Sequence, residues 1–453
     1  MSTVSGPSRS AERLRPWHAR KSFLVGGVAG ASGEPTFRTL VTGPRSTVPD
    51  SIDLGVTMIP LFAKRTPERE RSTGPARARR RRRVLAATLS ACLAVPFSAL
   101  SYTSAAAADS PADRSAGQAV GRAHSAADFQ GVNWARPKDN FVDGPVVPEG
   151  LDVSDDYATV KAKAGAIYEE FRETSGANTV RLPINTYSVP GTEWGDAYAG
   201  AVDAATENGF KVILSYWEDG ASSDGRIVDT QAFNAMWDAV TSRWRSDSRV
   251  YFEPMNEPHG YSAAEWTDVA AQWIDDRPWI PRKRIFVSGH GYNGDVTTVC
   301  NDSRLAGTYL SLHLYAFQFD SMSYDQWREL FDSRIGDCGS RTVLDEFGAP
   351  TDDGRDYGAA GSADNFVRYI RAATDAVRAH DMGAVYWPAL GGKHTYRPDY
   401  DWYSLYALEG SGTDLSLRVR NDSMIERLRH AWDGAGHAAP AAGEHRSSVP
   451  AGR

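Results

Sequence analysis

Apolar and polar positions follow two different rhythms between residues 128 and 392. Short apolar runs of strand length alternate with longer segments in which apolar residues recur at the helical period. Amphipathic segments such as residues 155–171 and 364–380 occupy most of the gaps, and the gap after the fifth run has the weakest pattern. The runs that predict strands are residues 128–136, 178–185, 211–218, 250–258, 284–293, 308–317, 341–349 and 383–392.

Eight strand-then-helix units predict an α/β fold, a (β/α)8 TIM barrel with a parallel inner sheet and an outer ring of helices. A doubly wound open sheet is the alternative. It is disfavoured because no glycine-rich phosphate loop follows an early strand. We expect one catalytic domain over residues 127–433.

The predicted strands begin apolar and end in polar or aromatic residues. In a barrel enzyme the C-terminal ends of the strands line the active site. A barrel with a purely structural role has no reason to gather polar groups at that end. The pattern therefore predicts an enzyme, and the residues that carry it include Asn133, Arg181, Trp217, Glu257, His290, His313, Glu346 and Trp387.

The arginine run and apolar segment of residues 77–109 have the layout of a secretory signal peptide, with cleavage near Ala107 or Ala108. Polar residues and Pro96 interrupt the apolar part, which makes it a poor spanning helix. We expect a secreted, extracellular protein without a stable membrane span in its mature form. The arginines are compatible with twin-arginine export, and a lipoprotein cleavage box ending at Cys92 is a less favoured reading.

The regions outside the barrel are polar and lack periodicity. Residues 1–57 predict a disordered extension or an over-called start, and residues 58–108 contain the signal peptide. Residues 109–126 predict a linker, and residues 434–453 a disordered tail.

Charge supports this division. The chain has 50 lysines and arginines and 57 aspartates and glutamates, of which 17 and 6 lie in residues 1–108. The remainder has a net charge of about −18, which disfavours nucleic acid and anionic membranes as partners. Two cysteines remain there, Cys300 and Cys338, and in an exported protein a pair predicts a disulfide. Two unrelated buried thiols are the alternative.

Glu257 and Glu346 end the fourth and seventh predicted strands. Two carboxyl groups facing each other across a barrel mouth can cleave a glycosidic bond. A separation of about 5–5.5 Å indicates a retaining enzyme, and about 6.5–9.5 Å leaves room for the water of an inverting one. Glu253 lies four residues before Glu257, and we expect it to be a buried structural carboxylate paired with an interior base. Strand alternation predicts that Asp345 points away from Glu346.

The sequences EPMNEP at residues 253–258 and DEFG at residues 345–348 resemble glycoside hydrolase family 5, the cellulase-like retaining glycosidases with (β/α)8 barrels. The resemblance covers about residues 128–433. It extends to Arg181-Leu182-Pro183 on the second predicted strand, His313 and Tyr315 on the sixth, and Trp387 on the eighth.

The resemblance implies a role for each of these residues. Glu257 would be the acid/base, with its pKa raised by apolar surroundings and the second carboxyl group. Glu346 would be the nucleophile, kept ionised by hydrogen bonds and by Arg181. A cis peptide is expected between Trp387 and Pro388. The implied substrate-binding residues are Arg181, Asn256, His313, Tyr315 and Trp387, to which the aromatic Trp217 and Trp402 are added because acidic residues flank them.

The sequence also departs from the family pattern. Many cellulases of this family have Asp-x-His near the end of the third strand, where this chain reads LSYWEDG at residues 214–220. Residues 391–406 form a long, charged, aromatic loop. These departures put plain β-1,4-glucan in doubt as the substrate. They favour an exo-acting glycosidase or a furanosidase as alternatives.

A catalytically inactive barrel that binds carbohydrate is the alternative from another functional class. The spacing of His290 and His313 does not fit a metal site, so we expect no metal and no cofactor. The partner is a carbohydrate substrate, and we expect a monomer.

Overall fold

The computed structural model describes residues 125–218, 220–393 and 403–433. Eight parallel strands form one sheet in the order β4-β3-β2-β1-β8-β7-β6-β5. An isolated parallel bridge between Phe252 of β4 and Ile285, directly before β5, brings the two edge strands together, so the barrel is nearly closed. This architecture confirms the predicted (β/α)8 barrel.

The eight predicted strands are all present, although several are shorter than the apolar runs. The fourth run contributes only four strand residues and the fifth only three, so that Glu257 and His290 follow strands rather than end them. The strand bounds are β1 Gln130–Pro137, β2 Thr179–Ile184, β3 Lys211–Tyr216, β4 Val250–Glu253, β5 Phe286–Ser288, β6 Tyr309–His313, β7 Thr342–Glu346 and β8 Gly383–Gly392.

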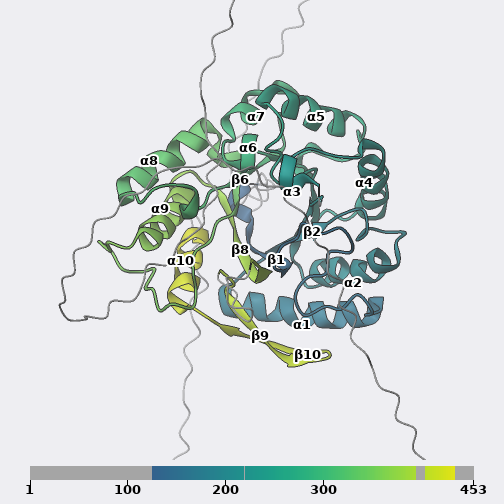
Figure 1. The fold of residues 1–453 in the computed structure, drawn as a ribbon, viewed down its shortest axis with the longest axis horizontal. Coiled ribbons are helices and arrows are strands. Elements are labelled where there is room, and N and C mark those ends of the chain that lie inside the picture. The colour runs from purple at the N-terminus through teal and green to yellow at the C-terminus, as the bar shows by residue number, and fades with distance from the viewer. Residues whose placement is uncertain (1–124, 219, 394–402, 434–453) are drawn as a thin grey trace, which may run out of the picture. The chain divides into compact units, whose positions relative to one another are not determined.

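Helices surround the barrel (Figure 1). Two very short helices, α6 and α7, separate β5 from β6, which explains the weak helical pattern after the fifth run. The bounds are α1 Tyr157–Ser175, α2 Glu193–Glu207, α3 Ala221–Asp224, α4 Thr230–Trp244, α5 Ala263–Asp275, α6 His290–Asn293, α7 Thr297–Asn301, α8 Tyr324–Ile335, α9 Asn365–Ala379 and α10 Asp422–Trp432.

An antiparallel hairpin between β8 and α10 was not predicted from the sequence. Its strands are β9, Tyr406–Ser411, and β10, Asp414–Val419. Gly412 in the turn has a φ of 60° and Gly410, near the end of β9, a φ of 88°, a backbone region that glycine enters without steric cost. The glycines between two strand-like runs were the signal for this hairpin.

The barrel interior consists of layers that differ in polarity. The layer nearest the N-terminal ends of the strands is apolar, and it is formed by Phe129, Ile213, Tyr251, Phe286, Tyr309, Val343 and Val385. Side chains two residues apart on a strand share a face. The next layer is therefore formed by Ser215, Glu253, Ser288, Ser311 and Asp345, which are all polar and buried. This polar layer supports the residues at the barrel mouth.

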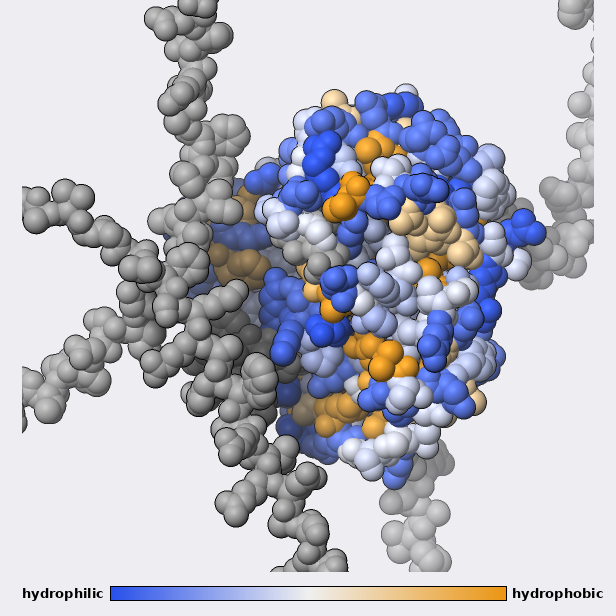
Figure 2. Space-filling model, turned by 45° about the vertical axis from the view of Figure 1, so that its right-hand side comes forward, coloured by the Kyte–Doolittle hydropathy of each residue, from blue (hydrophilic) through white to orange (hydrophobic). Residues whose placement is uncertain are grey.

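Cys300 of α7 and Cys338 of the 3-10 helix η5 (Gly336–Arg341) form a disulfide. This confirms the predicted pair and ties together the segments that precede β6 and β7. Hydrophilic residues predominate on the surface that Figure 2 shows, and its apolar patches are small and separate. Among the described residues, the helices are too short or too polar to cross a bilayer.

Candidate active site

Arg181 of β2 organises the polar interior. Its side chain is 1% exposed, and Nε and Nη2 donate to the two carboxylate oxygens of Glu253 at 2.7 and 2.9 Å. The predicted interior base for Glu253 is therefore Arg181. The same guanidinium group also donates to Glu346 Oε1 at 2.6 Å, Asn133 Oδ1 at 3.0 Å, Asn256 Oδ1 at 2.8 Å and Ser215 Oγ at 3.0 Å.

Glu346 is the last residue of β7 and is 3% exposed. Besides the bond from Arg181, it accepts one from the Tyr315 hydroxyl at Oε2, at 3.0 Å. Burial raises the pKa of Glu346 to about 7, against the lowering effects of Arg181 and Tyr315. The expected partners are present, but burial leaves this carboxyl group less fully ionised near neutral pH than the resemblance implied.

Glu257 lies in the loop after β4 with φ at 47°, a left-handed conformation that is uncommon for a residue with a side chain. His313 Nδ1 lies 3.1 Å from its Oε1. Burial, and after it the charge of Glu346, raises the pKa of Glu257 well above its ordinary value. The pKa of Glu257 therefore has the direction expected for a general acid.

His313, the last residue of β6, is fully buried. Burial and the nearby Arg181 lower its pKa well below the ordinary value, so the ring is neutral. The amide Nδ2 of Asn293 lies 3.2 Å from His313 Nε2. Because an amide nitrogen can only donate, Nε2 accepts and the ring proton lies on Nδ1, directed at Glu257.

Asn256 places an unused donor at the barrel mouth. Its Oδ1 accepts from Arg181, whereas its Nδ2 is buried without a hydrogen-bond partner among the described residues. An unpaired buried amide is costly. A ligand hydroxyl beside Glu257 would supply the missing acceptor.

Aromatic side chains also line the mouth. The rings of Trp217, after β3, and Trp387 of β8 stack with centroids 5.4 Å apart and planes 20° apart. Tyr315 and Ala135 complete this cluster, and Phe141 packs edge-on against Trp217 at 4.8 Å. The Trp387–Pro388 peptide is cis, as predicted. Trp402 lies outside the described residues.

The sequence profile of the family Cellulase (glycosyl hydrolase family 5) matches residues 152–390, more than half of the chain. The chain belongs to glycosyl hydrolase family 5. It is therefore a glycosidase by family.

Several solved structures are similar to this family 5 chain. An endocellulase from Pyrococcus horikoshii in complex with cellotetraose is 17% identical over 67% of this chain and 92% of its own, with a TM-score of 0.47. The catalytic domain of an endoglucanase from Thermobifida fusca, also with cellotetraose, is 17% identical over 66% and 91%, with a TM-score of 0.44. An endo-β-1,4-glucanase from Xanthomonas axonopodis pv. citri is 17% identical over 67% and 99%, with a TM-score of 0.45. No curated protein sequence matches the chain.

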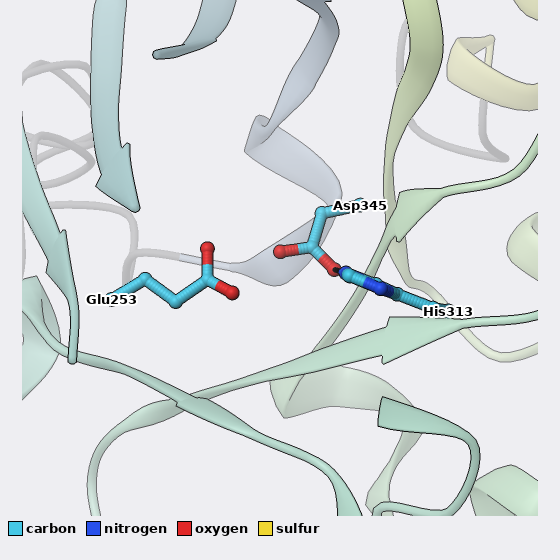
Figure 3. Close-up of side chains that lie close together, drawn as sticks. All are labelled: Glu253, His313 and Asp345. Atoms are coloured by element: carbon cyan, nitrogen blue, oxygen red, sulfur yellow. Dashed lines mark ion pairs between the residues drawn. The ribbon is translucent and has the colours of Figure 1, made fainter. Parts of the chain in front are cut away.

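One prediction about the site of this family 5 protein was wrong. Asp345 does not point away from the site, because it lies 3.7 Å from Arg181 Nε and 3.5 Å from His313 Nε2. Figure 3 shows its carboxyl group directed toward that of Glu253. The side chain of Asp345 points into the barrel because that of Val343, two residues earlier on β7, does so too. Glu346 also reaches the interior because the register between β6 and β7 shifts beside it, between Leu312 and His313.

Asp345 is poorly satisfied for a buried carboxyl group. Its Oδ1 accepts from the Ser311 hydroxyl at 2.7 Å, but Oδ2 has no hydrogen-bond partner among the described residues. Arg181 already directs its donors at other acceptors. Burial and the neighbouring Glu253 raise the pKa of Asp345 well above its ordinary value. The favoured state of Asp345 is therefore the neutral acid.

Two groups of three ligand atoms lie within 4.8 Å of one another in the described residues, Glu253–His313–Asp345 and Glu257–His313–Glu346. The first surrounds a region where Arg181 already supplies a positive charge to Glu253 (Figure 3). The donor geometry thus fits a guanidinium-centred network better than a cation site, and the absence of a metal stays a prediction.

Lys393 was not predicted from the sequence to lie near the site. Its Nζ lies 3.1 Å from Asp139 Oδ2 in the loop after β1. The charge of Lys393 opposes the rise in the pKa of Glu257, which places this ion pair near the general acid. Its position directly after β8, at the mouth end of the barrel, was the available signal.

Proposed function

We propose that the protein is a secreted retaining glycoside hydrolase that uses Glu346 as nucleophile and Glu257 as acid/base. The observation that carries the proposal is the pairing of the two carboxyl groups. One oxygen of each lies within 4.8 Å of the other and of His313, and this close approach supports the separation of about 5–5.5 Å between the carboxyl groups of a retaining enzyme.

In the first step, the Glu346 carboxylate attacks the anomeric carbon while the bond to the leaving oxygen breaks. Glu257 delivers its proton to that oxygen. In the second step, water attacks the anomeric carbon and passes a proton to Glu257. The bond between the sugar and Glu346 breaks, and the Glu346 carboxylate is restored. The anomeric configuration is inverted twice and therefore retained.

The surrounding residues support this division of labour. Arg181 and Tyr315 donate to Glu346 and favour its ionised form. His313 orients Glu257 through Nδ1. The free Nδ2 of Asn256 is available to a sugar hydroxyl, and Trp387 offers an apolar floor for the sugar ring.

The test is product release from aryl β-glycosides, furanosides and polysaccharides. We expect activity on one substrate class and a loss of at least about 10³-fold in kcat for Glu346→Gln. Glu409→Gln, at an exposed hairpin carboxylate, is the matched control and should behave as the wild type. Full activity of Glu346→Gln would overturn the proposal, whereas glycan binding without turnover by the wild type would favour an inactive binding barrel.

Nucleophile and acid/base are distinguished by leaving-group dependence. Glu257→Gln should be slow on unactivated glycosides but retain glycosylation of the enzyme by a dinitrophenyl glycoside, whose leaving group needs no acid. Glu346→Gln should be slow on both. Proton NMR of the first-formed anomer checks retention, and an inverted first product would contradict the mechanism.

We also propose export to an oxidising compartment. The signal-peptide pattern of residues 77–109 supports it, as does the Cys300–Cys338 disulfide. Fusing residues 58–109 to a reporter enzyme should direct the reporter out of the cell, and replacing the arginines at 81–83 by glutamine should retain it inside. A reporter that stays inside with the native segment would contradict this proposal.

A further inference from the structure

A cavity of about 290 Å³ lies between α8, α9 and the segment that follows β7, and it is called here the arginine cavity. Two arginines of α9, Arg368 and Arg371, line it together with Tyr324, Asp325 and Ser362. Helices α8 and α9 are neighbours in the outer ring (Figure 1). Because α8 follows β6 and the segment around Ser362 follows β7, the cavity lies at the same end of the barrel as the active site.

Hydrogen bonds between α8 and α9 fix the walls of this cavity. The Tyr324 hydroxyl donates to Asp375 Oδ2 of α9 at 2.8 Å. Near the other end of the contact, the indole Nε1 of Trp327 in α8 donates to Asn365 Oδ1 of α9 at 3.0 Å. The two helices are therefore joined at two points, and the cavity is formed before any ligand binds.

The two arginines of the cavity have few partners of their own. Among the described residues, the side chain of Arg368 donates to Ser321 Oγ at 3.1 Å, and that of Arg371 to the carbonyl oxygen of Gly358 at 2.7 Å. Neither forms an ion pair within those ranges. The Nε of Arg368 is buried and lacks a hydrogen-bond partner there. A guanidinium group has five N–H donors, so most of these donors are available to a ligand.

The carboxylates one helical turn away do not neutralise the arginines. Residues four apart on a helix are neighbours. On α9 these neighbours are Asp364, before the first arginine, and Asp375, after the second. Asp364 pairs with Arg355 at 3.1 Å and Asp375 with Arg427 at 2.7 Å. Two adjacent positive charges are thus left without a carboxylate beside a cavity, and a partly buried charge without a partner is costly.

The lining residues indicate the chemistry of a ligand. A guanidinium group matches the two oxygens of a carboxylate with two parallel N–H donors. The carboxylate of Asp325 would repel an inorganic oxyanion, but it can accept hydrogen bonds from hydroxyl groups. Ser362 Oγ accepts from the amide of Asp364 at 3.2 Å, which leaves its own hydroxyl hydrogen to donate. The volume lies near the lower end of the range for ligand pockets and exceeds what one inorganic oxyanion needs.

We propose that the arginine cavity binds a uronic-acid residue of a glycan, with the sugar carboxylate on Arg368 and Arg371 and the ring hydroxyls at Asp325 and Ser362. The site is separate from Glu257 and Glu346. It holds an acidic glycan at the catalytic end of the barrel and takes no part in bond cleavage. Binding there does not depend on the proposed glycosidase function.

The first test is calorimetric titration of the full-length protein with D-glucuronate and with D-glucose, which lacks the carboxylate. D-Glucose should bind at least about tenfold more weakly. Arg368→Gln should weaken D-glucuronate binding at least about tenfold, and Arg368→Lys should weaken it less, because it keeps the charge but loses the paired donors. Arg418→Gln, at an exposed arginine of the hairpin, removes the same charge elsewhere and is the matched control.

These variants also separate the cavity from the active site, because D-glucuronate bound at the catalytic glutamates would be insensitive to Arg368→Gln. Thermal unfolding checks that the variant is folded, and Arg371→Gln, with the same expected loss, replaces it if it is not. Equal affinities for D-glucuronate and D-glucose would overturn the proposal. Equal effects of Arg368→Gln and Arg418→Gln would overturn it as well.

The second test distinguishes a sugar from a simple anion. Acetate has the carboxylate without the ring, and inorganic phosphate is a bare oxyanion, so both should bind more weakly than D-glucuronate. Asp325→Ala should lower the ratio of D-glucuronate affinity to acetate affinity, because only the sugar loses a hydroxyl acceptor. An unchanged ratio, or phosphate that binds as tightly as D-glucuronate, would overturn the assignment to a sugar.

A third titration distinguishes a residue of a glycan from the free acid. In methyl D-glucuronoside the anomeric oxygen carries a substituent, as it does within a chain. Binding equal to that of D-glucuronate, with the same sensitivity to Arg368→Gln, is the expected result. Loss of binding with the glucuronoside would overturn the assignment to a glycan.

Discussion

At the scale of single residues, the balance of charge around Arg181 decides which carboxyl groups ionise. One guanidinium group serves Glu253 through two bonds and Glu346 through one. Asp345 receives a single hydroxyl donor, and Glu257 faces a neutral histidine. Burial raises the pKa of each group that Arg181 does not fully compensate.

The first prediction concerns the pH dependence of activity. Glu346 must be ionised and has a pKa of about 7, so kcat/KM should rise with pH up to about this value. Glu257 must be protonated, and its pKa is raised well above the ordinary value, so activity should fall again as pH increases further. A rising limb that is complete by about pH 5 would mean that Arg181 and Tyr315 outweigh burial.

The second prediction concerns Asp345. Because its pKa is higher in the folded than in the unfolded chain, protonation contributes stability at low pH that is lost as pH rises through the folded pKa. Asp345→Asn mimics the neutral acid. The difference in the free energy of unfolding between this variant and the wild type should therefore be larger at pH 9 than at pH 5, in favour of the variant. Urea unfolding at both values measures this gain, and a difference that does not depend on pH would show that Asp345 is ionised throughout.

At the scale of elements, each strand fixes the depth of its polar residues along the barrel axis. The short segments after the strands orient the side chains that follow. The loop after β4 turns Glu257 through a left-handed conformation. Helix α6 presents Tyr292 to His259. The register shift between β6 and β7 brings Glu346 inward beside Asp345.

The third prediction tests the link between α7 and η5. Replacing Cys300 and Cys338 by alanine should lower the free energy of unfolding by about 2–4 kcal/mol, because the unfolded chain loses a crosslink across 38 residues. Activity at 25 °C should be unchanged, since both cysteines precede the strands whose far ends carry the site. Loss of activity without loss of stability would place the disulfide in the function instead.

At the scale of the whole molecule, the barrel should be independent of the segment that precedes it. Residues 1–108 are basic and lack periodicity, whereas the rest of the chain is acidic. We predict that the chain shortened to residues 109–453 keeps the thermal midpoint and kcat/KM of the full-length protein. A midpoint lower by more than about 2 °C, which corresponds to about 1 kcal/mol or somewhat more for a chain of this size, would show that the preceding segment contributes to the fold.

The sequence by itself determined the fold class, the positions of the strands and most of the polar residues at the barrel mouth, and it favoured the disulfide. Periodicity decides which residues belong to strands, and the alternation of β and α elements decides the barrel. Glu253 could be paired with an interior base from its position alone. The hairpin β9–β10 was within reach of the same reasoning but was missed.

Only the tertiary structure decided what depends on contacts between distant residues. The single cation shared by Glu253 and Glu346, the inward turn of Asp345, and the stacking of Tyr292 on His259 join strands or loops far apart in the chain. Strand period assigns a side chain to a face, but register shifts and barrel closure decide which faces meet. The ionisation of the buried carboxyl groups follows from these contacts, since burial and pairing are properties of the folded barrel.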